Sequence, residues 1–237
     1  MKTVFLTFLV LITLPAFAQE GEILHDGLFW GIAGTNITKQ NSPWGVDLSV
    51  QNRMYKNFSR LQTILGTVHL NYRRPNQPWG FAVGYIGGVF EPLGVLHIAQ
   101  GRINRFGTLA NGKIPFVARL SYDRLWANPI YETDVRTPVN HRWRLLGQIT
   151  PPITKKISGF LAFEPFIIRR GLWFSETRGQ AGFRFLMKNA NLDVLYFNRW
   201  LKPINERDLT RFEHVFQVIY MHRIQFKSNK QTENSTN

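Results

Sequence analysis

The sequence predicts an all-β protein, a single antiparallel up-and-down transmembrane β-barrel of about twelve strands, with ten as the next choice, preceded by a cleaved signal peptide. Three observations predict this fold. Several segments alternate apolar and polar residues with a period of two. Aromatic residues make up 14% of the chain and charged residues only 19%. After the N-terminal segment no run approaches the roughly 18 apolar residues of a membrane-spanning helix, and a protein that crosses a bilayer without helices must be a closed barrel.

The first 18 residues are predicted to be a signal peptide. Lys2 supplies a positive charge, residues 4–14 form an apolar core, and Ala16-Phe17-Ala18 fits the small-x-small cleavage pattern. We expect cleavage before Gln19, because the apolar run is too short to serve as an anchor across about 30 Å of hydrocarbon. The chain contains no cysteine, which excludes a bacterial lipid anchor, disulfides and a thiolate nucleophile.

The clearest strand is predicted for residues 44–53 (WGVDLSVQNR), where Trp44, Val46, Leu48 and Val50 share one face and polar residues share the other. The same alternation recurs at 79–85, 116–123, 142–149, 178–185 and 216–226. Weaker alternation predicts strands near 28–38, 60–73, 93–103, 157–168 and 190–200. The strands of a soluble β-sandwich or lipocalin-like barrel also alternate apolar and polar residues. This pattern alone therefore does not show whether the apolar faces contact lipid or a protein core.

Breaker residues predict short turns at 41–43, 74–78, 151–156 and 188–191, and longer links at 86–92, 104–113, 125–140, 169–175 and 201–211. Short turns lie on the periplasmic side of outer-membrane barrels. These segments make eleven strands. Since bacterial single-chain barrels have even numbers, we expect that one strand is merged or missed near 20–38 or 93–113, which leads to twelve.

Three details favour a membrane barrel, occupying residues 19–226 in the outer membrane of a Gram-negative cell. Aromatic residues gather at strand ends, where interfacial girdles lie: Trp44, Tyr72, Trp79, Tyr85, Tyr122, Trp126 and Trp200. The opposite faces carry charged residues that a packed soluble core would not tolerate. The last strand ends in Phe226, which resembles the signal recognised by the barrel-assembly machinery, although a polar tail at 227–237 follows it.

The formal net charge is +14, and +13 once Lys2 leaves with the signal. Export argues against nucleic acid as the partner, so we expect outer-membrane lipids, including lipopolysaccharide, or an anionic solute whose identity the sequence does not determine. Arg169 and Arg170, in a predicted outer loop, are candidates for lipopolysaccharide phosphates, although exposed basic pairs are usually just solvated.

Polar residues on the faces opposite the apolar ones are predicted to line the lumen. They are Gln51, Arg53, His69, Asn71, Arg119, Asp123, Arg142, Arg144, Gln148, Glu164, Arg178, Gln180 and Arg184. We expect Glu164 to pair with Arg144 or Arg178, because an unpaired carboxylate in a narrow lumen is costly. One interpretation of the set is an arginine-lined path or pocket for an anion. The other is an internal salt-bridge network that plugs a small barrel, and the expected barrel size favours it.

The leading expectation is a barrel without enzymatic activity, structural or a narrow path for small polar or anionic solutes. An alternative is a lipid hydrolase of the outer membrane, using Ser121 with His69 or His141, or Ser175 with Glu176, although no spacing singles these out. A third is a soluble periplasmic barrel that binds an apolar ligand. The six histidines lack metal-ligand spacing, so neither a metal nor a cofactor is predicted.

A series of ordered landmarks covers nearly the whole mature chain. They are WGVDLSVQNR (44–53), Tyr72 to Arg74, Gly84-Tyr85, RLSYDRLW (119–126), HRWRLLGQITPPI (141–153), LAFEPFI (161–167), RGQAGFRF (178–185), LDVLYFNRW (192–200) and His214 to Gln217. In this order they resemble the family catalogued as domain of unknown function 2490. The resemblance implies an outer-membrane β-barrel and assigns no catalytic residue.

Overall fold

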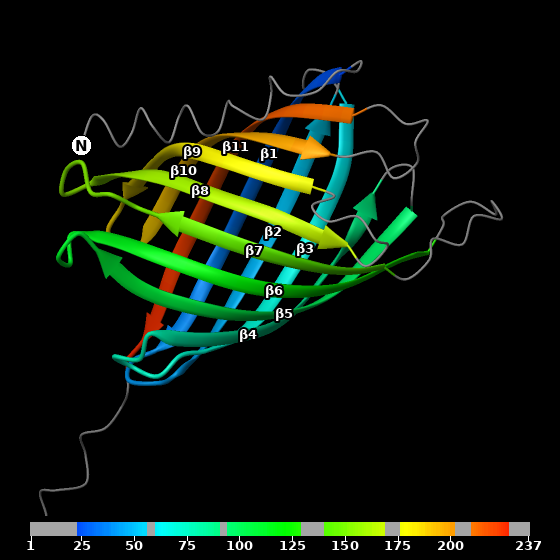
Figure 1. The fold of residues 1–237 in the computed structure, drawn as a ribbon. Helices are drawn as coiled ribbons and strands as arrows, with labels where there is room; N and C mark the ends of the chain where they lie inside the picture. Colours follow the sequence, from blue (N-terminus) through cyan, green and yellow to red (C-terminus); the bar gives the residue numbers. More distant parts are fainter. Residues whose placement is uncertain are drawn as a thin grey trace, which may run out of the picture.

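A computed structural model describes residues 23–55, 60–90, 94–128, 140–168, 176–201 and 210–227. Eleven strands in these ranges form one closed barrel (Figure 1). They are β1 (Ile23–Lys39), β2 (Trp44–Tyr55), β3 (Arg60–Tyr72), β4 (Trp79–Phe90), β5 (Gly94–Leu109), β6 (Ile114–Asn128), β7 (Asn140–Ile149), β8 (Ile157–Ile168), β9 (Glu176–Leu186), β10 (Ala190–Leu201) and β11 (Thr210–Phe226). No helix in the described ranges is long and apolar enough to cross a bilayer, a finding that does not bear on crossing by strands.

The predicted all-β, up-and-down barrel is confirmed, but it has eleven strands rather than twelve or ten. Consecutive strands pair antiparallel, and the barrel closes through a parallel pair between β1 and β11, from Ile23 opposite Thr210 to Lys39 opposite Phe226. The expectation of an even number assumed an antiparallel closing pair. A parallel closing pair lets an odd number of strands complete the ring.

The two regions suspected of hiding another strand are single long strands, 17 residues in β1 and 16 residues in β5. The longer link predicted at 104–113 is therefore wrong, because β5 continues to Leu109 and the chain reverses within a tight turn. Ala110, Asn111 and Gly112 have φ angles of 51°, 56° and 87° in that turn. Consecutive left-handed residues match the twist of a tight hairpin, so few residues suffice.

The two ends of the barrel differ. The turns at 40–43, 73–78, 110–113, 150–156 and 187–189 join strands at one end, which we call the short-turn end (Figure 1). Phe226 ends β11 at this end, whereas Ile23 begins β1 at the opposite end, because the two strands are parallel. The predicted signal peptide at 1–18 and nearly all of the predicted tail lie outside the described residues.

The outer face of the barrel is apolar and the inner face carries the charges. Trp44 and Phe81 are about half exposed, as are Leu145 and Phe183. Asp123, by contrast, is fully buried, and every aspartate and glutamate in the described residues points into the barrel. This distribution is the reverse of that in an ordinary water-soluble protein.

Candidate functional site

A row of inner-face residues crosses seven consecutive strands, β1 to β7, at one level. The row consists of the register partners Asn36, Asp47, His69, Gly84, Gln100, Asp123 and Arg142. The Asn36 amide donates to Asp47 at 2.5 Å, and the Gln100 amide donates to Asp123 at 2.5 Å. His69 Nε2 lies 2.8 Å from Gln100 Oε1. We call this set the lateral row.

Gly84 lets the lateral row continue across β4. His69 on β3 and Gln100 on β5 are not on adjacent strands, so their contact must pass over the strand between them. A Cβ at position 84 would lie 2.1 Å from the His69 ring and 2.5 Å from the Val68 carbonyl oxygen. The absence of a side chain is therefore a condition for the hydrogen bond between the imidazole and the amide.

Gly84→Ala is expected to destabilise the barrel by about 1–3 kcal/mol, because the added methyl group overlaps a backbone oxygen and displaces His69. Gly101→Ala is the matched control, since a Cβ at this position of β5 meets nothing within 4 Å. That substitution is expected to be neutral or stabilising by about 0.5–1 kcal/mol. Urea unfolding of the two variants measures the difference, and equal stabilities would contradict the role given to Gly84.

A chain of alternating acidic and basic side chains continues from the lateral row around the interior. It runs through Asp123, Arg144, Glu164, Arg178, Glu176, Arg199, Glu213, Arg211 and Asp26, with Arg142 as a second partner of Asp123. We call it the ion-pair belt. It joins β6, β7, β8, β9, β10, β11 and β1, so it links the two strands that close the barrel to the strands opposite them. Glu164 contacts both arginines proposed for it, Arg144 at 3.4 Å and Arg178 at 3.5 Å.

Glu176 has the shortest contacts of the belt. Its carboxylate lies 2.6 Å from Arg178 and 2.6 Å from Arg199, and Arg199 also reaches Glu213 at 2.7 Å. All three acidic partners of these arginines are nearly inaccessible to solvent. Charges removed from water need such compensation, because an unpaired buried ion costs several kcal/mol.

Apolar side chains fill the space beside the belt. Leu28, Trp30, Phe197 and Val215 form one buried cluster, and Phe160, Ala162 and Leu195 form another. The Arg178 guanidinium lies 4.4 Å from the Phe166 ring centre and 5.3 Å from that of Trp30. Cation–π contact of this kind lets an arginine pack within an aromatic environment. The interior along β8, β9, β10, β11 and β1 is therefore occupied by protein.

The other side of the interior contains a cavity at the short-turn end, with a volume of about 380 Å³. Asn36 and Asp47 line its inner part, and Asn71, Arg102, Asn104 and Arg119 line its walls. Interior-facing residues of β4 are small here: Gly80 borders the cavity, and Ala82 and Gly84 follow on the same face. We call this space the short-turn cavity.

On the described part of the outer face, three tyrosine–histidine pairs form hydrogen bonds with the same arrangement across neighbouring strands. These pairs are Tyr85–His97, Tyr122–His141 and Tyr196–His214. In each, the histidine is the register partner of the residue two positions after the tyrosine, which places it closer to the end opposite the short turns. Trp126 stacks on His97 and Trp143 packs against Tyr122, so the pairs belong to an aromatic band.

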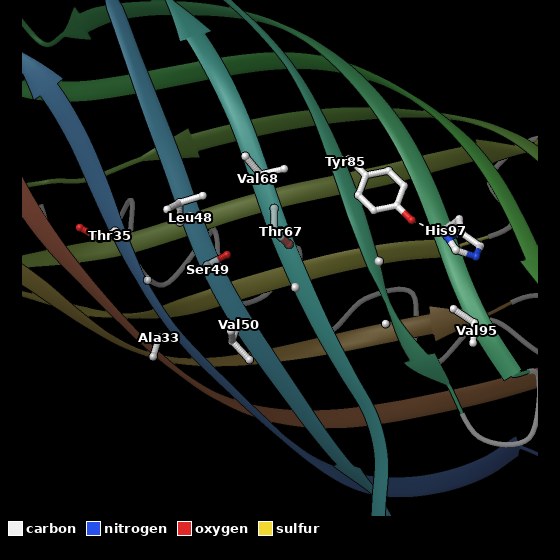
Figure 2. A pocket seen from close by; sticks show the side chains of 14 residues that line it. Ala33, Thr35, Leu48, Ser49, Val50, Thr67, Val68, Tyr85, Val95 and His97 are labelled. Atoms are coloured by element: carbon white, nitrogen blue, oxygen red, sulfur yellow. Dashed lines mark hydrogen bonds between the residues drawn. The ribbon is translucent and has the colours of Figure 1, made fainter.

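A shallow hollow of about 700 Å³ lies on the outer face over β1 to β5 (Figure 2). Ala33, Gly66 and Gly87 create it, because their small size leaves space between the larger apolar side chains Leu48 and Val68. The Tyr85–His97 pair borders this hollow (Figure 2). The hollow continues the apolar outer surface and has no charged side chain among its described lining residues.

Register and burial place all thirteen predicted lumen residues on the inner face. The ion-pair belt contains Asp123, Arg142, Arg144, Glu164 and Arg178. The lateral row contains His69, and the wall of the short-turn cavity contains Asn71 and Arg119. Arg184 pairs with Asp193, Arg53 contacts Gln51 and the Trp30 ring, and Gln148 and Gln180 flank Ala162. The thirteen predicted lumen residues thus lie in several different environments inside the barrel.

The sequence did not reveal a considerable part of the polar interior. The residues missed include Asn36, Gln100, Arg102, Glu176, Asp193, Arg199 and Glu213. The alternation of 216–226, continued toward the N-terminal end of the strand, would have placed Glu213 inside. In β10 the inner face combines Asp193 and Arg199 with Leu195 and Phe197, so a polar-against-apolar pattern was not visible.

The residues considered for hydrolysis are not assembled in the described part of the chain. The Ser121 hydroxyl is buried and has no hydrogen-bond partner, whereas His69 bonds Gln100 and His141 bonds Tyr122 on the outer face. The Glu176 carboxylate forms ion pairs with Arg178 and Arg199. Ser175, Arg169 and Arg170 lie outside the described residues. Within the described ranges no three acidic, histidine or cysteine side chains are grouped as metal ligands.

Comparisons with family models and with curated proteins found no match for this chain. The resemblance to the family of unknown function stays a prediction.

Proposed function

We propose that this chain is an outer-membrane β-barrel whose lumen is closed by its own side chains, with a structural or ligand-binding role rather than that of an open channel. The observation that carries the proposal is the inverted distribution of residues, with large apolar side chains outside and ion pairs inside. An apolar exterior of this extent is costly in water and favourable in lipid.

Two aromatic zones border the apolar exterior. Trp44 packs on Tyr72 near the short-turn end, with Trp79 on the neighbouring strand, and the tyrosine–histidine pairs lie toward the other end. Gly87, the register partner of His97, lies eight positions after Trp79 along β4. Eight positions correspond to about 26 Å of strand. For a strand tilted by about 40° this is about 20 Å across the membrane, near the ~25 Å apolar band of such barrels.

Outward-facing charges in the described strands support this placement, because they lie only near strand ends. Arg105 is level with Trp79, the first residue of β4, and Arg124 is level with His141, the second residue of β7. Lys39 is the last residue of β1. The region between these levels therefore suits acyl chains, in which a charge near the midplane costs about 2–4 kcal/mol.

The packed interior favours a closed barrel over a conduit. Leu65 and Ile98 are nearly inaccessible on β3 and β5, and Trp30, Phe197 and Val215 are equally buried on the opposite side. Residues that water cannot reach do not line a water-filled path. The salt-bridge network considered from the sequence is thus the interpretation favoured for most of the lumen.

Cell fractionation followed by electrophoresis of unheated and boiled samples tests the proposal. We expect extraction only with detergent and faster migration of the unheated protein, because a closed barrel stays compact until heat breaks its hydrogen bonds. Planar bilayers containing the same protein are expected to show no steady conductance. Recovery in the periplasmic fraction without detergent would contradict the membrane location, and a stable open current would contradict the closed lumen.

A further inference from the structure

We propose that the short-turn cavity is a binding site for a small oxyanion, held by Arg102 and Arg119. The site lies inside the barrel, so it does not depend on what surrounds the outer face. Arg102 and Arg119 differ from the interior arginines that contact carboxylates. Arg53 also contacts no carboxylate in the described part of the chain, but it lies outside this cavity and packs over the Trp30 ring.

Most interior arginines are neutralised by the protein. Among the described residues, Arg142, Arg144, Arg178, Arg184 and Arg199 each contact at least one carboxylate within 3.5 Å. Arg119 contacts no carboxylate, and its Nε donates to the Asn104 side-chain oxygen at 2.7 Å. Within the described ranges Arg102 has neither an ion pair nor a hydrogen bond, and its Nε is buried without a partner. The protein therefore leaves two guanidinium groups uncompensated in one cavity.

Neither arginine has an acidic register partner, and Asp123, two positions beyond the β6 partner of Arg102, pairs with Arg142 and Arg144 instead. Arg102 lies between Ala82 on β4 and Ser121 on β6. Arg119 lies between Asn104 on β5 and Leu146 on β7. None of these neighbours carries a charge.

The cavity as a whole is positive. Its charged lining residues are three arginines, Arg73, Arg102 and Arg119, against one aspartate, Asp47. Asp47 Oδ1 accepts a hydrogen bond from the Asn36 amide at 2.5 Å, and within the described ranges the Asp47 carboxylate forms no ion pair with these arginines. A partly buried cation without a carboxylate partner is costly, and the most direct compensation is an anion that enters from outside.

The chemistry and size of the site define the ligand class. Planar guanidinium groups form paired hydrogen bonds with carboxylate and phosphate oxygens, which favours an oxyanion over chloride. Side-chain amides of Asn71 and Asn104 add further polar groups to the wall. The volume of about 380 Å³ lies at the lower end of the range for small-molecule sites, so it suits inorganic phosphate or a short dicarboxylate.

The test uses the full mature chain folded in a nonionic detergent, with thermal unfolding followed by tryptophan fluorescence. Sodium phosphate, sodium succinate and sodium chloride are titrated at constant ionic strength. We expect a saturable rise of the unfolding temperature with phosphate or succinate and none with chloride, because an anion that binds only the folded state stabilises it. Equal responses to all three salts, or to none, would overturn the proposal.

Two variants and one control assign the effect to the cavity. Arg102→Gln is expected to weaken oxyanion affinity by about tenfold or more, and to leave the anion-free protein as stable as before or more stable, because an unpaired cation is removed. Arg119→Gln is expected to weaken affinity similarly and serves if the first variant does not fold. Arg105→Gln removes an outward-facing arginine of the same strand and is expected to keep the wild-type response. Wild-type affinity in both cavity variants would disprove the site.

Discussion

Glu176→Gln is expected to lower the free energy of unfolding by about 3 kcal/mol. The substitution keeps the size of the side chain and removes the charge that compensates Arg178 and Arg199, each 2.6 Å away. Breaking a buried ion pair costs about 3–5 kcal/mol when one charge is left unpaired. The lower value applies, because Arg178 keeps Glu164 and Arg199 keeps Glu213. Urea unfolding in lipid vesicles measures the loss.

Asp193→Asn is the matched control for this prediction. Asp193 contacts only Arg184, at 2.7 Å, and the Arg184 side chain is 27% exposed, so water can solvate the arginine that remains. We expect a loss of about 1 kcal/mol. If Asp193→Asn lowers the free energy of unfolding as much as Glu176→Gln does, membership of the ion-pair belt does not explain the importance of Glu176. A negligible loss in both variants would contradict a stabilising belt.

Cysteines at the two ends of the chain are expected to react from opposite sides of the outer membrane. Glu20→Cys precedes β1 by a few residues and Lys227→Cys follows β11 directly, and β1 and β11 are parallel. If the short turns face the periplasm, as expected from the sequence, a membrane-impermeant maleimide labels Glu20→Cys in intact cells. It labels Lys227→Cys only after the membrane is permeabilised. The absence of native cysteine makes each label specific.

Lys155→Cys provides the reference for the short-turn end, since Lys155 is exposed in the turn between β7 and β8. Its accessibility must match that of Lys227→Cys. Labelling of Glu20→Cys only after permeabilisation would place both chain ends in the periplasm. That result would contradict the parallel closure of β1 with β11 and favour an even number of strands.

The faces of the strands were predictable because alternation is a local property. Val46, Leu48 and Val50 point outward and Asp47 and Gln51 inward, as the period of two requires. The same reasoning placed Glu164 inside and paired it with arginines of the adjacent strands. Both the direction of these side chains and the pairing of Glu164 follow from the local sequence and the order of the strands.

The strand number and the interior residues that the sequence did not reveal required the three-dimensional arrangement. In β5, the small residues Ala99 and Gly101 lie on the outer face beside the inward Gln100 and Arg102, so the alternation of size and polarity is weak. In β10 and β11 the inward Phe197 and Val215 interrupt the polar face, because part of the lumen is filled with apolar side chains.

The sequence by itself determined the class of fold, the direction of most side chains and the presence of many interior arginines. The tertiary structure decided which of those arginines have a carboxylate beside them, how the barrel closes and where a cavity remains. The physical reason is that pairing depends on the register between strands. Arg144 lies opposite Ser121 and Phe166 and reaches the carboxylates two positions along, Asp123 and Glu164. Arg102 lies opposite Ala82 and Ser121 and contacts no carboxylate among the described residues. A shift of register changes those partners and leaves the composition of each strand unchanged.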